Sequence, residues 1–174
     1  MRIGRGPAAR ADRGPDSRWH KCRRVDPTRS GAYPGRVDVG VDGRTVRIVP
    51  HRLACCAVEL DEALRRMGSD AAVAPGPQAA GEPDVHVLVV AGTVTRVGLP
   101  TVLAAFEALP EPRAVVAFGA CTLTGGPYWD SYSVVPGLRS LLPGAVEVAG
   151  CPPRPDAVPD AVRVAALHAL GEGS

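Results

Sequence analysis

The sequence predicts an α/β fold in which a parallel sheet is flanked by helices. Aromatic residues are only 4% of the 174 residues, whereas apolar residues are 45%. The core must therefore be filled mainly by Ala, Val and Leu, a composition that suits strands buried on both faces beneath helices. Short β-branched runs alternate with amphipathic segments, which is the rhythm of βαβ units. One domain of ordinary core size accounts for this length.

Basic residues are concentrated at the start of the chain. Residues 1–36 contain ten Lys or Arg and three Asp, a net charge of +7, which leaves −5 for the rest of the chain. They are rich in Gly, Pro and Arg, without apolar periodicity or the apolar run of a signal peptide, so we expect a disordered basic tail. Residues 37–174 are then a single domain. No window has the roughly 18 consecutive apolar residues of a membrane-spanning helix.

The first part of the domain predicts a hairpin followed by a helix. Arg36–Val49 alternates apolar and polar residues around Asp42 and Gly43, a dipeptide typical of tight hairpin turns. Ala57–Gly68 has apolar residues at helical spacing, acidic residues in its first turn and arginines in its last turn. This distribution of charge matches the helix dipole, and Gly68 provides a stop.

The rest of the domain alternates strands and helices. VHVLVV is typical of a central parallel strand, and prolines bracket the helix that follows it. Residues 74–83 contain three prolines and two glycines and predict a loop. Right-handed crossovers between the strands then give a parallel sheet. The expected elements are strands at Val85–Val90, Ala114–Phe118 and Ala145–Gly150, and helices at Thr101–Leu109, Pro136–Leu142 and Asp156–Leu170.

Four of the five cysteines lie where ligands of a metal group would be expected. The number is odd, two cysteines are adjacent and an export signal is absent, which argues against a disulfide framework. Cys55 and Cys56 precede the first helix, whereas Cys121 and Cys151 each follow a strand. Because the carboxyl ends of parallel strands lie along one edge, these four thiols are expected to converge. Cys22 lies in the basic tail and is left out of the set.

Thiolate ligands select iron-sulfur clusters or zinc, and four of them are the usual ligands of a cubane cluster. Structural zinc sites draw their ligands from close CxxC pairs. The intervals between the four cysteines are 1, 65 and 30 residues, which favours a 4Fe-4S cluster while leaving zinc as the alternative.

The residues around the thiols allow two interpretations. Adjacent side chains on a strand point to opposite faces, so Cys55 and Cys56 need a bent backbone to bind one group, and we expect local strain there. The alternative is that the pair is two small apolar residues entering a core. Glycines near the sulfurs permit close backbone approach, although ordinary loops also use them. These glycines are Gly119, Gly125, Gly126 and Gly150.

Several motifs together resemble the B subunit of bacterial complex I, which in mitochondria is the 20 kDa subunit. The resemblance covers about Leu53–Val158 and includes adjacent cysteines, a GxCxxxGG and a GCPPRP in that order. It implies a flavodoxin-like fold and one 4Fe-4S cluster bound by Cys55, Cys56, Cys121 and Cys151. The motifs that carry it are at Cys55–Glu59, Val89–Thr95, Leu109–Gly126, Ser131–Gly137 and Val148–Pro155.

The resemblance also implies a function. The chain would be the electron-transfer subunit of an NADH-quinone oxidoreductase, inactive alone, that reduces quinone at an interface with a larger quinone-site subunit. It would lie peripherally on the cytoplasmic side of the cell membrane, held there by partner subunits, and nucleic acid is not an expected partner. Glu59 lies one helical turn from the cysteine pair and would couple proton uptake to reduction. The alternative for Glu59 is a solvated carboxylate that favours the helix N-terminus.

Two segments depart from the family pattern and leave other functions open. VRIVPHRLA replaces the usual aromatic-containing stretch before the cysteine pair, and residues 74–83 contain no Arg. These departures suit a divergent paralogue. The first alternative is the small subunit of a membrane-bound [NiFe] hydrogenase-like complex, although such subunits usually begin their ligand set with CxxC. The second is a non-redox assembly module that binds zinc or no metal.

Overall fold

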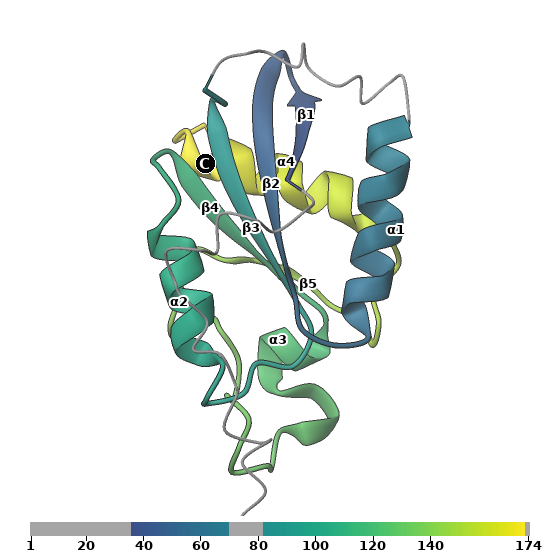
Figure 1. The fold of residues 1–174 in the computed structure, drawn as a ribbon, viewed down its shortest axis with the longest axis vertical. Helices are drawn as coiled ribbons and strands as arrows, with labels where there is room; N and C mark the ends of the chain where they lie inside the picture. Colours follow the sequence, from purple (N-terminus) through teal and green to yellow (C-terminus); the bar gives the residue numbers. More distant parts are fainter. Residues whose placement is uncertain (1–35, 70–81, 173–174) are drawn as a thin grey trace, which may run out of the picture. The chain divides into compact units, whose positions relative to one another are not determined.

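A computed structural model describes residues 36–69 and 82–172, all within a unit that spans residues 33–174. It confirms the α/β class, because helices flank a five-stranded sheet of order β1-β2-β3-β4-β5 (Figure 1). The expected tail, apart from Arg36, and most of the expected loop at 74–83 lie outside the described residues. The elements are β1 (Val37–Val41), β2 (Arg44–Arg52), α1 (Cys56–Ser69), β3 (Val85–Ala91), α2 (Leu99–Glu107), β4 (Arg113–Phe118), α3 (Ala120–Thr124), η4 (Gly126–Tyr128), β5 (Val146–Val148) and α4 (Ala157–Ala169).

The predicted hairpin is confirmed. β1 pairs antiparallel with β2, and the turn between them has positive φ at both Asp42 (49°) and Gly43 (80°), as a type I′ turn requires. β2 continues three residues beyond the predicted end at Val49, to Arg52, and pairs in parallel with β3 along this length. The strand therefore carries the chain to within three residues of Cys55.

Strands β2 to β5 are parallel, and their carboxyl ends are aligned. Their last residues pair with one another in a single row across the sheet. The loops that follow these strands therefore start from one straight edge, as the sequence predicts. The row consists of Arg52, Ala91, Phe118 and Val148.

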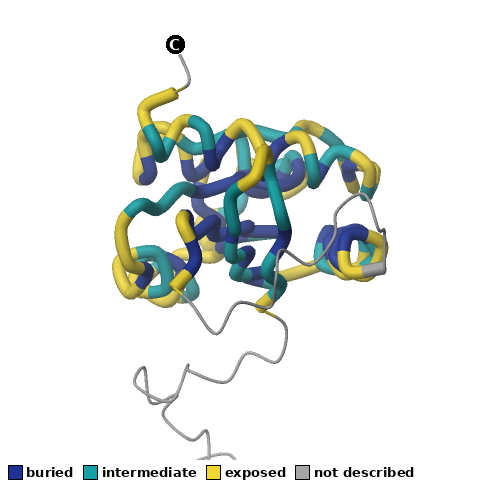
Figure 2. The backbone as a smooth tube through the Cα atoms, turned by 90° about the horizontal axis from the view of Figure 1, so that it is seen from above, coloured by how far each residue is buried: buried dark blue, intermediate teal, exposed yellow. Residues whose placement is uncertain are grey.

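The two faces of the sheet carry separate apolar cores. β3 is buried along its whole length, so alternate residues contribute to opposite cores. Val87 and Val89 belong to the core with α1 and α4, whereas Leu88 and Val90 belong to the core with α2. In Figure 2 the buried backbone runs through the middle of the sheet, between helices with exposed outer surfaces.

The connections on the two faces have opposite hands. Strands β2, β3 and β4 follow one another across the sheet in one direction, yet α1 and α2 pack on opposite faces. The expectation that both crossovers are right-handed is therefore wrong for one of them. The reason is β1, which occupies the edge position where the flavodoxin-like order 2-1-3-4-5 has its second strand. In the described residues, β3 is the next element after α1.

The helices expected on either side of β3 and at the end of the domain are confirmed as α1, α2 and α4. α1 has Glu59 in its first turn and Arg66 in its last turn, which complements the helix dipole. α2 begins with Pro100 near its first position, as predicted. Among residues 36–69 and 82–172, no helix combines the length and the apolar character that crossing a membrane requires.

The segment between β4 and β5 differs from the prediction. The helix expected at Pro136–Leu142 is a series of turns, in which the Leu141 and Leu142 N–H groups both donate to the Leu138 carbonyl oxygen. Gly137, which has a φ of +111°, and Pro143 interrupt the segment at its two ends. α3 and η4 were not predicted, and β5 has three residues rather than six.

Candidate metal centre

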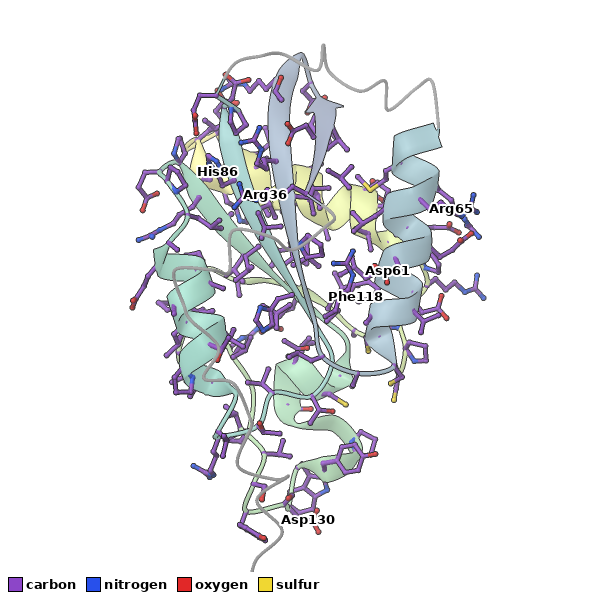
Figure 3. The ribbon with its side chains drawn as sticks, viewed as in Figure 1. Arg36, Asp61, Arg65, His86, Phe118 and Asp130 are labelled. Atoms are coloured by element: carbon purple, nitrogen blue, oxygen red, sulfur yellow. The ribbon has the colours of Figure 1, made fainter. Side chains whose placement is uncertain are left out.

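The structure brings the four cysteines of the predicted set to the carboxyl edge of the sheet. Cys55 and Cys56 follow β2, Cys121 is in α3 directly after β4, and Cys151 lies three residues after β5. Sulfur atoms gather near α3 and the first turn of α1 in Figure 3. All four thiols are free, with Cys56 and Cys121 buried and Cys55 and Cys151 exposed.

The Cys56 thiol lies within electrostatic reach of the other three. Burial raises the pKa of Cys56 to about 12, and Cys55, Cys121 and Cys151 each add to this rise. The Cys55 thiol also forms a hydrogen bond with it. Cys56 is therefore a protonated thiol in the metal-free protein, and a metal group has to displace its proton on binding.

Helix α1 begins between the two adjacent cysteines. Cys55 lies in the turn before the helix and is exposed, whereas Cys56 is the first helical residue and is 1% exposed. The expectation of backbone strain at this pair is wrong, because Asp42 is the one non-glycine residue with positive φ in the described ranges. Because the backbone bends where α1 begins, the two side chains do not have to point to opposite faces as they would on a strand.

Two glycines leave space for the sulfur atoms. A Cβ atom at Gly119 would lie 2.5 Å from Cys56 Sγ, and one at Gly126 would lie 2.9 Å from Cys121 Sγ. Both glycines have positive φ, at 104° and 55°. Each sulfur therefore rests directly on a bare backbone, a close approach that no other residue permits.

The other two glycines near the thiols support the surrounding loops. A Cβ atom at Gly125 would lie 2.9 Å from the Trp129 Cα atom, and one at Gly150 would lie 2.5 Å from the Pro153 Cα atom. Gly125 and Gly150 therefore match the alternative, that of glycines required by the packing of ordinary loops. At Gly119 the nearest atom is the Cys56 sulfur, and at Gly126 the main-chain nitrogen and the sulfur of Cys121 are equally close, at 2.9 Å.

The four thiols are soft donors of the kind that suits an iron-sulfur cluster, with zinc as the alternative. In the described part of the chain, no three His, Cys, Asp or Glu side chains converge tightly enough to hold one metal ion. A cubane places one thiolate on each of four irons, so its ligands surround a larger volume than the ligands of zinc. Four soft sulfur donors, two of them buried and backed by glycine, match that requirement.

Glu59 and Arg154 flank the thiols. Glu59 is half-buried in the first turn of α1, three residues after Cys56, where a carboxylate also favours the helix dipole. Arg154 is exposed, three residues after Cys151, and would add positive charge near a bound cluster. The role of Glu59 in proton coupling stays a prediction.

Thr122 is a residue of this edge that the sequence did not single out. Its side chain is fully buried, and its hydroxyl group lies within hydrogen-bonding distance of Gly92 and of the Phe118 carbonyl oxygen. The only signal in the sequence is a polar residue placed directly after Cys121. Threonine is too common at such positions for this signal to predict a contact.

A second polar row crosses the opposite edge of the sheet. Asp38, Arg47, His86 and Arg113 pair in register on adjacent strands, and Arg47 binds Asp38 through two hydrogen bonds of 2.8 Å. His86 is 4% exposed, and its Nδ1 atom has no hydrogen-bond partner. Figure 3 shows His86 in the part of the domain far from α3, the helix that carries Cys121. This row therefore lies away from the thiols.

Stability is expected to fall in mild acid because of the buried histidines. Burial lowers the pKa of both His51 and His86 from 6.5, and Arg47 lowers it further at His86. The unfolded chain titrates near 6.5. Below this pH it binds protons that the folded state does not, so unfolding is favoured as the pH falls. Each histidine contributes at most about 1.4 kcal/mol per pH unit.

His86→Leu is expected to reduce this acid sensitivity and to raise the melting temperature at pH 5.5 more than at pH 7.5. The change also removes an unsatisfied buried nitrogen, worth about 1–3 kcal/mol. Thermal unfolding followed by circular dichroism at both pH values measures the effect. The control is His168→Leu, since His168 is exposed on α4. Equal pH responses of wild type and His86→Leu would contradict the prediction.

Sequence relatives share the part of the chain that carries the thiols. The chain is 44% identical over 106 residues to a B subunit of the NADH-quinone oxidoreductase of Streptomyces griseus, covering 61% of this chain and 45% of that protein. It is 43% identical over 106 residues to a B subunit of the NADH-quinone oxidoreductase of Salinispora tropica, covering 61% of this chain and 56% of that protein. The chain thus spans about half the length of these curated relatives.

A solved structure and a family match extend the comparison. A chain of the membrane-bound sulfane sulfur reductase, an archaeal respiratory membrane complex, is similar with a TM-score of 0.51 and 26% identity, covering 71% of this chain and 70% of that one. Residues 52–165 match the family of the NADH ubiquinone oxidoreductase 20 kDa subunit, and they include all four cysteines of the edge. The chain therefore belongs to the family of the NADH ubiquinone oxidoreductase 20 kDa subunit.

Proposed function

We propose that this chain is the electron-transfer subunit of a complex I-type NADH-quinone oxidoreductase. It carries one 4Fe-4S cluster on Cys55, Cys56, Cys121 and Cys151 and passes electrons to quinone at an interface with a larger partner subunit. The observation that carries the proposal is that all four cysteines follow parallel strands at one edge of the sheet, in a chain of this family. The chain acts as a part of the assembly and has no activity alone.

The burial of the thiols suits electron transfer. The cluster, when bound, supplies one-electron redox chemistry. Cys56 and Cys121 hold it from the buried side, whereas Cys55 and Cys151 are exposed. The site therefore reaches the protein surface, where an electron can pass to a molecule bound at an interface. Gly119 and Gly126 keep side chains away from the two buried sulfurs.

The proposed partner is the large quinone-site subunit, and an aromatic loop supplies a surface for it. Tyr128, Trp129 and Tyr132 are 55%, 71% and 89% exposed, on the segment that follows Cys121. Aromatic side chains are enriched at the centres of protein interfaces, and they cost free energy when left in water. We place the assembly on the cytoplasmic side of the cell membrane, with this chain peripheral and held there by partner subunits.

The experiment that tests the cluster is anaerobic reconstitution of the full chain with ferrous iron and sulfide. We expect about four irons and four sulfides per chain and a broad absorption band at about 400 nm. Cys121→Ala is expected to abolish both signals because a ligand is missing. Cys22→Ala is the matched control, since Cys22 is the one cysteine outside the set. Stoichiometric zinc, or a full cluster in Cys121→Ala, would overturn the assignment.

Glu59 is proposed to take up a proton when the cluster is reduced. The midpoint potential of the wild type is then expected to fall with rising pH, by up to about 59 mV per unit, and Glu59→Gln should flatten this slope. Redox titration followed by electron paramagnetic resonance measures it. The control is Glu62→Gln, a carboxylate of the same helix that is paired with Arg65 and Arg66. An unchanged slope in Glu59→Gln would remove the role.

A second candidate is the same electron-transfer role in a different membrane complex. The likeness to a chain of the archaeal sulfane sulfur reductase favours it, because that complex is respiratory and membrane-bound. A hydrogenase-like assembly belongs to this class. Co-purification of the tagged chain separates the two: a quinone-site subunit supports the first candidate, and a hydrogenase-like large subunit supports the second. A non-redox zinc module is excluded by iron and sulfide in the reconstitution.

A further inference from the structure

Cys121 and Cys151 lie on segments that are hydrogen-bonded to each other. The Gly119 N–H donates to the Val148 carbonyl oxygen at 2.9 Å, and the Ala120 N–H donates to the Gly150 carbonyl oxygen at 2.7 Å. Gly119 and Ala120 directly precede Cys121 in the chain, and Val148 and Gly150 lie just before Cys151. These main-chain bonds hold the segment of Cys121 next to the segment of Cys151.

The Cys55–Cys56 pair is held by a different segment, the end of β3. The Leu53 N–H donates to the Ala91 carbonyl oxygen at 3.0 Å. The next residue, Ala54, lies directly on Gly92, where a Cβ atom would be 2.6 Å from the Ala54 nitrogen. The main chain just before the pair is therefore tied to the end of β3 and to Gly92, whereas the Cys56 sulfur packs against Gly119 at the start of α3.

The hydroxyl group of Thr122 joins these two parts of the site. It donates a hydrogen bond to the Gly92 carbonyl oxygen at 2.8 Å, and it accepts one from the Gly92 N–H at 3.3 Å. The carbonyl oxygens of Val90 and Phe118, at 3.4 and 3.2 Å, lie close enough to share its proton. In the described stretches of the chain, no other hydrogen bond links Gly92 directly to α3.

We propose that Thr122 is a positioning residue that sets the spacing between the Cys55–Cys56 pair and Cys121. The inference rests on the proposed function, because the spacing matters when one rigid cluster binds all of these thiols. A shift of α3 relative to Gly92 moves Cys121 Sγ away from Cys56 Sγ while leaving Cys121 and Cys151 together. Residues that orient ligands in this way typically change metal affinity when they are replaced.

A buried threonine can also serve stability alone, so the experiment has to separate the two roles. Thr122→Val keeps the approximate shape of the side chain and replaces the hydroxyl group by a methyl group. Thr122→Ser keeps the hydroxyl group and removes a methyl group. If the spacing of the thiols depends on the hydroxyl, Val and Ser have opposite effects on the cluster, although both disturb the packing.

The full chain and both variants are reconstituted anaerobically with ferrous iron and sulfide. The reduced cluster is examined by electron paramagnetic resonance, and its loss to a chelator is followed by absorbance. In Thr122→Val we expect a changed spectrum and a loss about tenfold faster than in wild type. In Thr122→Ser both are expected to match wild type. In the cluster-free protein, the Gly92 amide of Thr122→Val should exchange with solvent about tenfold faster.

The outcomes distinguish this inference from the proposed function. If Thr122→Val retains the wild-type spectrum and rate of loss while its Gly92 amide exchanges faster, the hydroxyl serves stability and the positioning role is overturned. The same conclusion follows if Thr122→Ser behaves as Thr122→Val. If wild type takes up no iron and sulfide, the cluster itself is wrong, and the amide exchange still reports whether the Thr122–Gly92 bond exists.

Discussion

Gly119→Ala is expected to prevent stable cluster loading while most of the fold remains. The new Cβ atom would lie 2.5 Å from Cys56 Sγ and 3.6 Å from Pro153 Cδ. The sulfur is the end of a side chain and can rotate away, so the fold can relieve the clash only by moving a ligand. Iron and sulfide per chain are expected to fall at least about tenfold after reconstitution. The backbone of this residue, with φ of 104° and ψ of 153°, lies in a region that nearly excludes other residues and adds a cost of about 1–3 kcal/mol.

Gly144→Ala is the matched control for this substitution. Gly144 also has positive φ, 87°, but a Cβ atom there would meet nothing within 4 Å. It therefore carries the backbone cost without the contact to a sulfur. Elemental analysis and thermal unfolding of both variants separate the two effects. A Gly119→Ala protein that binds as much iron and sulfide as Gly144→Ala would show that Cys56 is free to move and still bind.

Gly137→Ala is expected to give the largest loss of stability. A Cβ atom at Gly137 would lie 1.9 Å from the Leu123 carbonyl oxygen and 2.8 Å from the Leu123 carbonyl carbon. Both are main-chain atoms of α3, so no side-chain rotation can relieve the contact. Overpacking and the positive φ of +111° together should cost about 3–5 kcal/mol. The melting temperature should fall by on the order of 10 °C.

The Gly137→Ala substitution is also expected to affect the thiol site. The neighbouring Leu138 N–H donates to the Thr122 carbonyl oxygen at 2.9 Å, next to Cys121. Displacing this segment is therefore expected to lower cluster retention as well as stability. Denaturant unfolding of the cluster-free protein measures the first effect, with Gly144→Ala again as the control. A loss of less than about 1 kcal/mol relative to that control would contradict the close packing of these two segments.

Much of the fold could be predicted from local patterns. The Asp42–Gly43 turn, the β-branched run of β3 and the charges of α1 each have a direct physical meaning, and all three predictions are confirmed. The placement of the cysteines at one edge followed from the parallel sheet. That step needed only the order of strands and loops, because all strand ends of a parallel sheet face the same way.

The errors arose where the structure depends on distant contacts. Pro136–Leu142 has the apolar spacing of a helix, but Leu138 and Leu142 are buried in a segment held by α3, and no local signal reports this contact. The hand of the α1 connection depends on which strand occupies the edge position. The strain expected at Cys55 and Cys56 was derived from strand geometry, whereas the pair lies at the start of a helix.

The same limit applies to the candidate site. The four cysteines could be selected by residue type and position, and Gly119 and Gly126 by their proximity in the sequence. The hydroxyl of Thr122 gains its role only through Gly92, which is thirty residues away in the chain. A hydrogen bond over such a separation has no signature in composition, periodicity or spacing.

The polar row of Asp38, Arg47 and His86 has a practical consequence. It crosses the amino edge of the sheet, and the thiols follow the carboxyl edge. Substitutions in this row are therefore expected to change the free energy of unfolding without changing what the cysteines bind. Stabilisation of the chain can begin at His86. Measuring the midpoint potential of the cluster in the His86→Leu variant will show whether stability and redox properties can be changed independently.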